Sequence, residues 1–233
     1  GCPAKKVVSG AAGSALMREE ELASKILRAV VKAVQIPVTV KMRTGWDDEN
    51  RNAPGLARIA EDVGVQQVSV HGRTRCQFYN GESDWGFIRK VKDAVNVPVI
   101  GNGDVVAVED AAALIKIVKV DGVMVGRGIQ GRPWFLSHII HYLETGERLE
   151  EPSVDARLDI VLNHLDMMLS HYGIERGLRV WRKHLVWYTK KLIHVSSYRD
   201  RLFKSGDPFK IKDCLRHLFD AELTVLKPNA VFE

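Results

Sequence analysis

Two cationic side chains share one face of a short apolar run near the start of the chain. In residues 38–43 every second residue is apolar, and strand periodicity places Lys41 and Arg43 together on the opposite face. Strands of a parallel α/β sheet are covered on both faces, and a buried cation needs a partner. The pair therefore predicts an anionic ligand at this strand end, with a solvent-exposed face as the alternative.

Two glycine-rich turns follow later apolar runs, GNGD at 101–104 and GRG at 126–128. Glycine lets backbone N–H groups approach a phosphate closely, and the following helix N-terminus adds its dipole. Barrels commonly bind phosphate in the loops after their last two strands. A phosphate site is predicted, with tight strand-to-helix turns as the alternative. His71, at another strand end, is a candidate ligand contact or proton carrier, or else a core histidine.

The three cysteines, Cys2, Cys76 and Cys214, are scattered along the chain. They form no disulfide framework, which favours a reducing cytoplasm. Cys2 lies in a loop and is either catalytic or a small apolar residue. Cys76 and Cys214 have no acid, base or metal-ligand spacing nearby, so both are interpreted as structural and no metal site is expected. No run of apolar residues or signal segment indicates a membrane, and nothing implies a protein partner.

A repeating pattern of strands and helices is expected to position these residues. Short β-branched runs predict strands at 38–42, 67–71, 97–101 and 122–126, and amphipathic stretches predict helices at 19–34, 53–63, 84–95, 108–118 and 133–144. This alternation indicates βαβ units with right-handed crossovers. The polar residues fall at or just past the C-terminal strand ends, which favours half of a (β/α)8 barrel over a doubly wound sheet.

From about residue 152 the pattern is helical only, with helices predicted at 154–171, 175–192 and 211–226. We therefore predict a partial barrel over residues 1–150 and a small all-helical domain over 151–233. Residues 173–212 hold eleven Lys or Arg against three acids, a net +8 that leaves −3 for the rest of the chain's +5. This asymmetry favours a polyanionic partner, with a solvated helical surface as the alternative.

Aromatic residues interleave with the cations of that basic stretch, an arrangement that suits RNA contacts. They are Trp181, Trp187, Tyr188 and Tyr198. At helical spacing aromatic residues are more often core, and Trp187 at least is expected to be buried.

Five separated motifs resemble the tRNA-dihydrouridine synthase family. They are GCPAKKV at 1–7, VKMRTGW at 40–46, VHGRTR at 70–75, VIGNGD at 99–104 and MVGRG at 124–128. RPW at 132–134 and RKH at 182–184 with WY at 187–188 resemble the tRNA-dihydrouridine synthase B branch. The resemblance covers essentially the whole chain.

That resemblance implies an FMN-binding (β/α)8 barrel followed by a helical tRNA-binding domain. The four visible strands would be the last four of the barrel, and the chain would begin in the loop after the fourth, so the fragment alone is expected to be inactive. NADPH would reduce FMN, and the reduced flavin would pass hydride to C6 of a flipped-out uracil, giving 5,6-dihydrouridine, with the D-loop as the expected location.

The resemblance also assigns roles to individual residues. Cys2 would protonate C5 of the uracil, and Lys41 would face the pyrimidine edge of the flavin. The FMN phosphate would be held by Asn102, Gly103, Asp104, Gly126 and Arg127, with His71 as a further contact. Arg43 and Arg73 would contact the substrate, and Arg182 and Lys183 the tRNA. The alternatives are an FMN-dependent barrel oxidoreductase of the dihydroorotate dehydrogenase type, acting on a small pyrimidine, and an inactive RNA-binding remnant.

Overall fold

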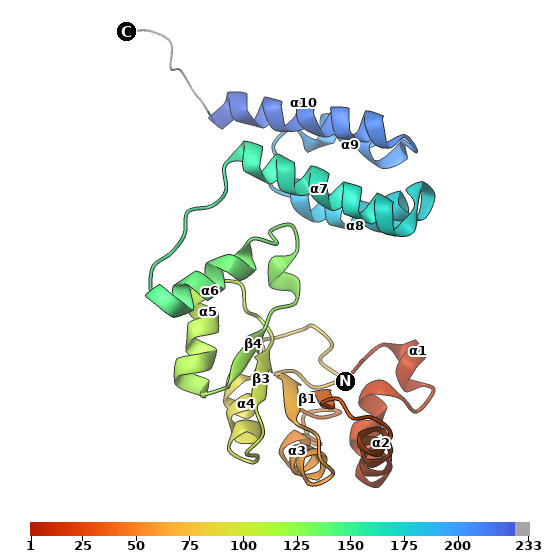
Figure 1. Ribbon diagram of the computed structural model, residues 1–233, viewed down its shortest axis with the longest axis vertical. Helices are drawn as coiled ribbons and strands as arrows, with labels where there is room; N and C mark the ends of the chain where they lie inside the picture. The colour runs from red at the N-terminus through yellow and green to blue at the C-terminus, as the bar shows by residue number, and fades with distance from the viewer. Residues whose placement is uncertain (227–233) are drawn as a thin grey trace. The chain divides into compact units, whose positions relative to one another are not determined.

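The computed structural model describes residues 1–226 and divides into two compact units. The first unit comprises Gly1–Ile129 and Trp134–Arg148. The second comprises Gln130–Pro133 and the chain from Leu149 onward. Figure 1 shows strands only in the first unit, with helices alone in the second.

A four-stranded parallel sheet is the centre of the first unit. Its strands are β1 (Thr39–Arg43), β2 (Gln67–His71), β3 (Val99–Asn102) and β4 (Gly122–Met124), which pair in sequence order. This confirms the predicted α/β class with parallel strands. Val68, Val70 and Val99 on the two central strands are fully buried, whereas β4 is half-buried throughout and β1 is partly exposed. The difference follows from position, because β1 and β4 are the two edges of the described sheet.

Helices precede and connect the strands as βαβ units require. They are α1 (Lys5–Val8), the 3-10 turn η1 (Gly13–Arg18), α2 (Glu20–Ala33), α3 (Ala53–Asp62), α4 (Trp85–Lys92), α5 (Val108–Ala113), the π-helical η2 (Leu114–Val118), the 3-10 turn η3 (Arg127–Ile129) and α6 (Phe135–Thr145). The helix predicted to reach residue 95 stops at Lys92, and a tighter turn, with Ala94 N–H donating to the Val91 carbonyl, leads to β3. The short α1 and η1 were not predicted, since single turns carry no periodicity.

The second unit contains the helices α7 (Val154–Tyr172), α8 (Ile174–Thr189), α9 (Val195–Lys204) and α10 (Pro208–Leu226). Their core includes the fully buried Leu165, Trp181 and Leu185. The expectation that Trp187 is a core residue is wrong, because Trp187 is only half-buried. Trp181 and Leu185 are one helical turn apart on one face of α8, and a residue six positions after Trp181 points to another side.

Helix α9 was missed because it is short and six of its ten residues are polar. Leu202 is its one buried residue, so a search for an apolar face finds little to detect. The segment Gln130–Pro133 joins this unit through Gly131, whose φ is +75°. A Cβ at Gly131 would come within 2.5 Å of the Trp187 carbonyl oxygen, so only glycine fits against the end of α8.

Within residues 1–226, none of the helices combines the length and the apolar composition needed to cross a membrane.

Candidate active site

The register of the sheet places three polar side chains and Met124 in one row at the C-terminal strand ends. Arg43 pairs with His71, His71 with Asn102, and Asn102 with Met124, each on the next strand. Neighbouring strands lie about 4.8 Å apart, so the row spans roughly 14 Å of one edge. This edge is where the chemistry of barrel enzymes is found.

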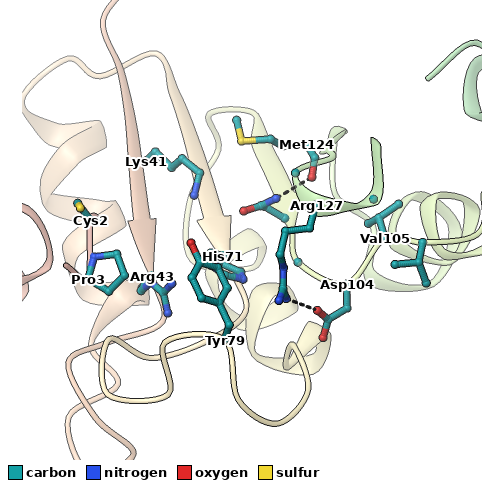
Figure 2. Close-up of a pocket in the computed structure, with 16 residues that line it drawn as sticks. Cys2, Pro3, Lys41, Arg43, His71, Tyr79, Asp104, Val105, Met124 and Arg127 are labelled. Atoms are coloured by element: carbon teal, nitrogen blue, oxygen red, sulfur yellow. Dashed lines mark hydrogen bonds and ion pairs between the residues drawn. The ribbon is translucent and has the colours of Figure 1, made fainter. Parts of the chain in front are cut away.

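A cavity of about 540 Å³ opens over this edge (Figure 2). Its lining contains nine of the residues that the sequence singled out: Cys2, Lys41, Arg43, His71, Asn102, Gly103, Asp104, Gly126 and Arg127. Arg73 is absent from the lining, and Arg182 and Lys183 belong to the second unit. The volume lies within the range of small-molecule and cofactor sites.

Cys2 is held at the β1 side of the cavity by its backbone. The Ser14 N–H donates to the Cys2 carbonyl at 3.0 Å, at the start of η1. Gly13, with φ +60°, packs against this carbonyl, and a Cβ there would come within 2.7 Å of the oxygen. The Cys2 side chain remains exposed in the cavity. The arrangement fixes the main chain and leaves the thiol accessible to a ligand.

The charge of the cavity lining is positive. Lys41, Arg43 and Arg127 contribute three cations against the single carboxylate of Asp104. Burial, together with the charges of Arg43, Lys41 and Arg73, lowers the pKa of His71 to about 3, so its imidazole is neutral at pH 7. Partial burial and the Arg43 charge also lower the pKa of Lys41. The cavity is therefore suited to an anion, and His71 can accept or donate a hydrogen bond there without adding charge.

Two buried arginines hold the loop 72–84 that connects β2 to α4. Arg43 donates through Nη1 to the carbonyls of Thr74 (2.7 Å) and Phe78 (2.8 Å). Arg73 donates through Nε to the Asn80 carbonyl (3.1 Å) and through Nη2 to the Gly81 carbonyl (2.5 Å). Four backbone oxygens of one loop are thus satisfied by two guanidinium groups.

Tyr79 is a cavity residue that the sequence reasoning missed. Its ring lies 4.6 Å from the Arg127 guanidinium carbon and 5.6 Å from that of Arg43, and its centroid is 6.4 Å from the His71 ring. In Figure 2 it stands between the β1 side and the Arg127 side of the cavity. The available signal was an aromatic residue in a loop that directly follows a strand's C-terminal end.

The two glycine turns bring their backbones close to neighbouring groups. A Cβ on Gly103, where φ is +120°, would lie 2.3 Å from Ser83 Oγ. A Cβ on Gly128 would collide with the Val105 carbonyl oxygen, whereas at Gly126 the space is open. Asn102 Nδ2 donates to the Met124 carbonyl at 2.7 Å and so joins the two turns. These features leave room for a ligand at Gly126, between the ends of β3 and β4.

The predicted tRNA contacts of the second unit differ in exposure. Arg182 is half-buried and donates from Nη2 to the Ser205 carbonyl at 2.9 Å, whereas Lys183 is exposed.

Across residues 1–226, His, Cys, Asp and Glu side chains form no group of three that could hold a metal ion.

Known proteins resemble this chain over most of its length. The dihydrouridine synthase family model matches residues 1–222. A probable tRNA-dihydrouridine synthase of Rickettsia bellii is 54% identical over 213 residues, which are 91% of this chain and 65% of that protein. tRNA-dihydrouridine synthase B of Xanthomonas campestris is 45% identical over 228 residues, 98% of this chain and 69% of that protein. The chain thus spans about two thirds of the length of these relatives.

Among solved structures, a crystal structure of mandelate oxidase matches 89% of this chain and 69% of that chain, with 17% identity and a TM-score of 0.30. A likeness at this level bears on neither the fold nor the cofactor. The family match and the identities to the relatives confirm the resemblance that the five motifs predicted. The chain belongs to the dihydrouridine synthase family, in the branch that includes tRNA-dihydrouridine synthase B.

Proposed function

We propose that this chain is part of an enzyme that reduces uridine in tRNA to 5,6-dihydrouridine, using FMN and NADPH. In this proposal β1 to β4 are the last four strands of an eight-stranded barrel, and the helices of the second unit bind tRNA. The observation that carries it is the placement of one exposed thiol, Cys2, in the same cavity as a cationic cradle for an anionic cofactor. Family membership supports the reaction class.

The residues present fit FMN. Arg127, the open backbone at Gly126 and the turn that begins at Gly103 provide a cation and close backbone approach for the phosphate. Lys41, at the other side of the row, provides a cation for the pyrimidine edge of the ring, where negative charge develops on reduction. The row of strand ends is about 14 Å long from β1 to β4, a length that suits a ligand with a ring at the β1 end and a phosphate at the β4 end.

Bound FMN, reduced by NADPH, would supply the hydride that adds to C6 of the uracil. Cys2 completes the addition by giving the proton of its thiol to C5, so that the C5=C6 bond becomes a single bond. Arg43 and the neutral His71 lie in the same row and can donate hydrogen bonds to the uracil carbonyls.

The tRNA partner is proposed from the charge of the second unit. Lys183, Lys190 and Lys191 are exposed on or just after α8 and are available to phosphates. Arg182 is not included among these phosphate contacts, because it already donates to the Ser205 carbonyl. A uridine within a folded tRNA must leave its stack to reach a cavity, so base extrusion is part of the proposal, and the D-loop is the proposed location.

The Cys2→Ala substitution in the complete protein tests the assignment. FMN binding and flavin reduction by NADPH should be unchanged, whereas uracil reduction should slow by about 10²- to 10⁴-fold, the usual contribution of a general acid. Cys76→Ala is the matched control, because Cys76 is also an exposed thiol but lies outside the cavity lining. A Cys2→Ala enzyme that forms dihydrouridine at nearly the parent rate would remove Cys2 from the mechanism.

A further inference from the structure

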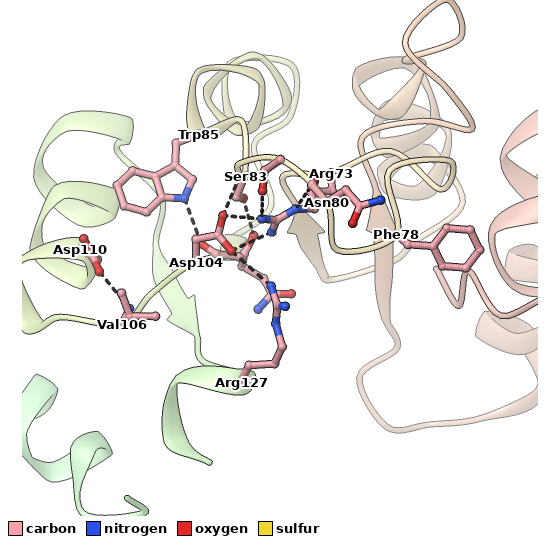
Figure 3. Close-up of polar contacts among 12 residues, drawn as sticks. Arg73, Phe78, Asn80, Ser83, Trp85, Asp104, Val106, Asp110 and Arg127 are labelled. Carbon is pink, nitrogen blue, oxygen red and sulfur yellow. Dashed lines mark hydrogen bonds and ion pairs between the residues drawn. The ribbon is translucent and has the colours of Figure 1, made fainter. Parts of the chain in front are cut away.

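Arg73 is a buried cation with all three of its nitrogens engaged. Its side chain is 3% exposed. Besides the Asn80 and Gly81 carbonyls, it donates from Nη1 to Asp104 Oδ1 at 2.8 Å and from Nη2 to Asp104 Oδ2 at 2.6 Å (Figure 3). This paired geometry is the strongest that an arginine and a carboxylate form. Arg73 therefore joins two loops, the one after β2 and the one after β3.

Asp104 is itself held in an unusual backbone conformation. Its φ is +55° and directly follows Gly103 at +120°, so two successive residues occupy a region that side chains rarely adopt. The Ser83 N–H donates to Asp104 Oδ2 at 2.8 Å, and Trp85 Nε1 donates to the Gly103 carbonyl at 3.0 Å. Such conformations persist where surrounding contacts fix them, and here those contacts come from loop 72–84 and the start of α4.

The carboxylate of Asp104 is ionised. Partial burial alone would raise its pKa, but the hydrogen bonds from Arg73 and Ser83 and the charges of Arg73 and Arg127 hold it below its usual value. A negative charge beside a phosphate site is unfavourable unless another group compensates it. Arg73 supplies that compensation from the buried side, away from the cavity.

Arg127 forms a longer and more exposed ion pair with the same carboxylate. Its Nη2 lies 3.4 Å from Asp104 Oδ1, and its side chain is 52% exposed. An exposed pair at this distance contributes little to stability. Arg127 also lines the cavity, which Arg73 does not.

We propose that Arg73 is a positioning residue, which clamps Asp104 and loop 72–84 together, and that Arg127 is the cation that moves from Asp104 to the phosphate of the ligand. The clamp sets the backbone of the phosphate turn and the position of Tyr79 over the cavity at the same time. Because Arg73 neutralises Asp104, Arg127 can leave the carboxylate when the phosphate arrives. The part of this inference in which Arg127 binds a phosphate rests on the proposed function, whereas the clamp formed by Arg73 does not.

The test compares Arg73→Gln and the charge-retaining Arg73→Lys with the parent, in the complete protein. Amide hydrogen exchange of residues 72–84 and 103–106, measured without any ligand, should accelerate in both variants, more in Arg73→Gln. Affinity for FMN and for riboflavin, which lacks the phosphate, should each fall by about 10-fold or more, because removing one partner of a buried pair displaces both loops. Arg89→Gln, which breaks the exposed Arg89–Asp93 pair of α4, is the matched control and should change neither measurement.

Arg127→Ala should behave differently, with weaker binding of FMN, unchanged binding of riboflavin and parent-like exchange of both loops. If Arg73→Gln and Arg73→Lys weaken FMN alone and leave exchange unchanged, Arg73 is a direct phosphate ligand and the inference is wrong. Parent-like exchange with parent-like binding of both flavins would show that the loops are held without Arg73. A parent protein that binds neither flavin would contradict the proposed function, while the exchange rates would still decide the clamp.

Discussion

The neutral His71 in a cationic cavity predicts a specific dependence of stability on pH. The folded protein lowers the pKa of His71 to about 3, against ~6.5 for an unfolded histidine. Between these values the unfolded chain binds a proton that the folded protein does not, so stability is lost as pH falls below about 6.5. At about pH 5 the linkage amounts to roughly 2 kcal/mol at most, and solvent in the cavity reduces it to about 1–2 kcal/mol.

The His71→Asn variant of the complete protein measures this contribution. Asparagine keeps a neutral hydrogen-bonding side chain and cannot titrate. Urea unfolding at about pH 7.5 and about pH 5 should show the parent losing about 1–2 kcal/mol more than the variant. His171→Asn, at an exposed position on α7, should retain the parent's dependence. An identical loss of stability in the parent and in His71→Asn would refute the reasoning, because His71 would then not resist protonation in the folded state.

Two further predictions concern tRNA and the chain by itself. Replacing the exposed Lys183, Lys190 and Lys191 by Ala should weaken tRNA binding and lower its salt slope by up to about 0.9 for each phosphate that is no longer neutralised, with NADPH oxidation in the absence of tRNA unchanged. A parent-like salt slope in this variant would identify these lysines as a solvated surface. Residues 1–233 expressed alone should be inactive and bind FMN weakly, since the described sheet is open at β1 and β4. Elution of a monomer with stoichiometric FMN from gel filtration would contradict the half-barrel proposal.

The parts of the fold that the sequence predicted well are those with a local signal. The run at 67–71 is β2 residue for residue, because its β-branched Val68 and Val70 alternate with polar residues at the period of a strand. The glycine turns were identified for a similar reason, since Gly103 and Gly128 occupy positions where a Cβ would collide. In both cases the requirement acts on the residue itself, so the residue type reveals it.

The loop contacts of Arg43 and Arg73 had no such local signal in the sequence. Both Arg43 and Arg73 donate to backbone carbonyls of loop 72–84, contacts that the sequence did not indicate, while their predicted contacts to the substrate stay predictions. Any residue type can supply a carbonyl, so no pattern in the sequence marks such a partner. Tyr79 was missed because loop residues have no periodicity. The pairing of Arg73 with Asp104 joins residues 31 positions apart, which only the folded chain brings together.

Our central proposal is that the protein reduces uridine within tRNA, and direct detection of the product tests it. Unmodified tRNA is incubated with the complete protein, FMN and NADPH, digested to nucleosides and analysed by mass spectrometry, with free uracil and orotate offered in parallel. We predict dihydrouridine in the tRNA digest, dependent on NADPH and strongly reduced in Cys2→Ala. Reduction of the free pyrimidines with tRNA left unmodified would contradict the account.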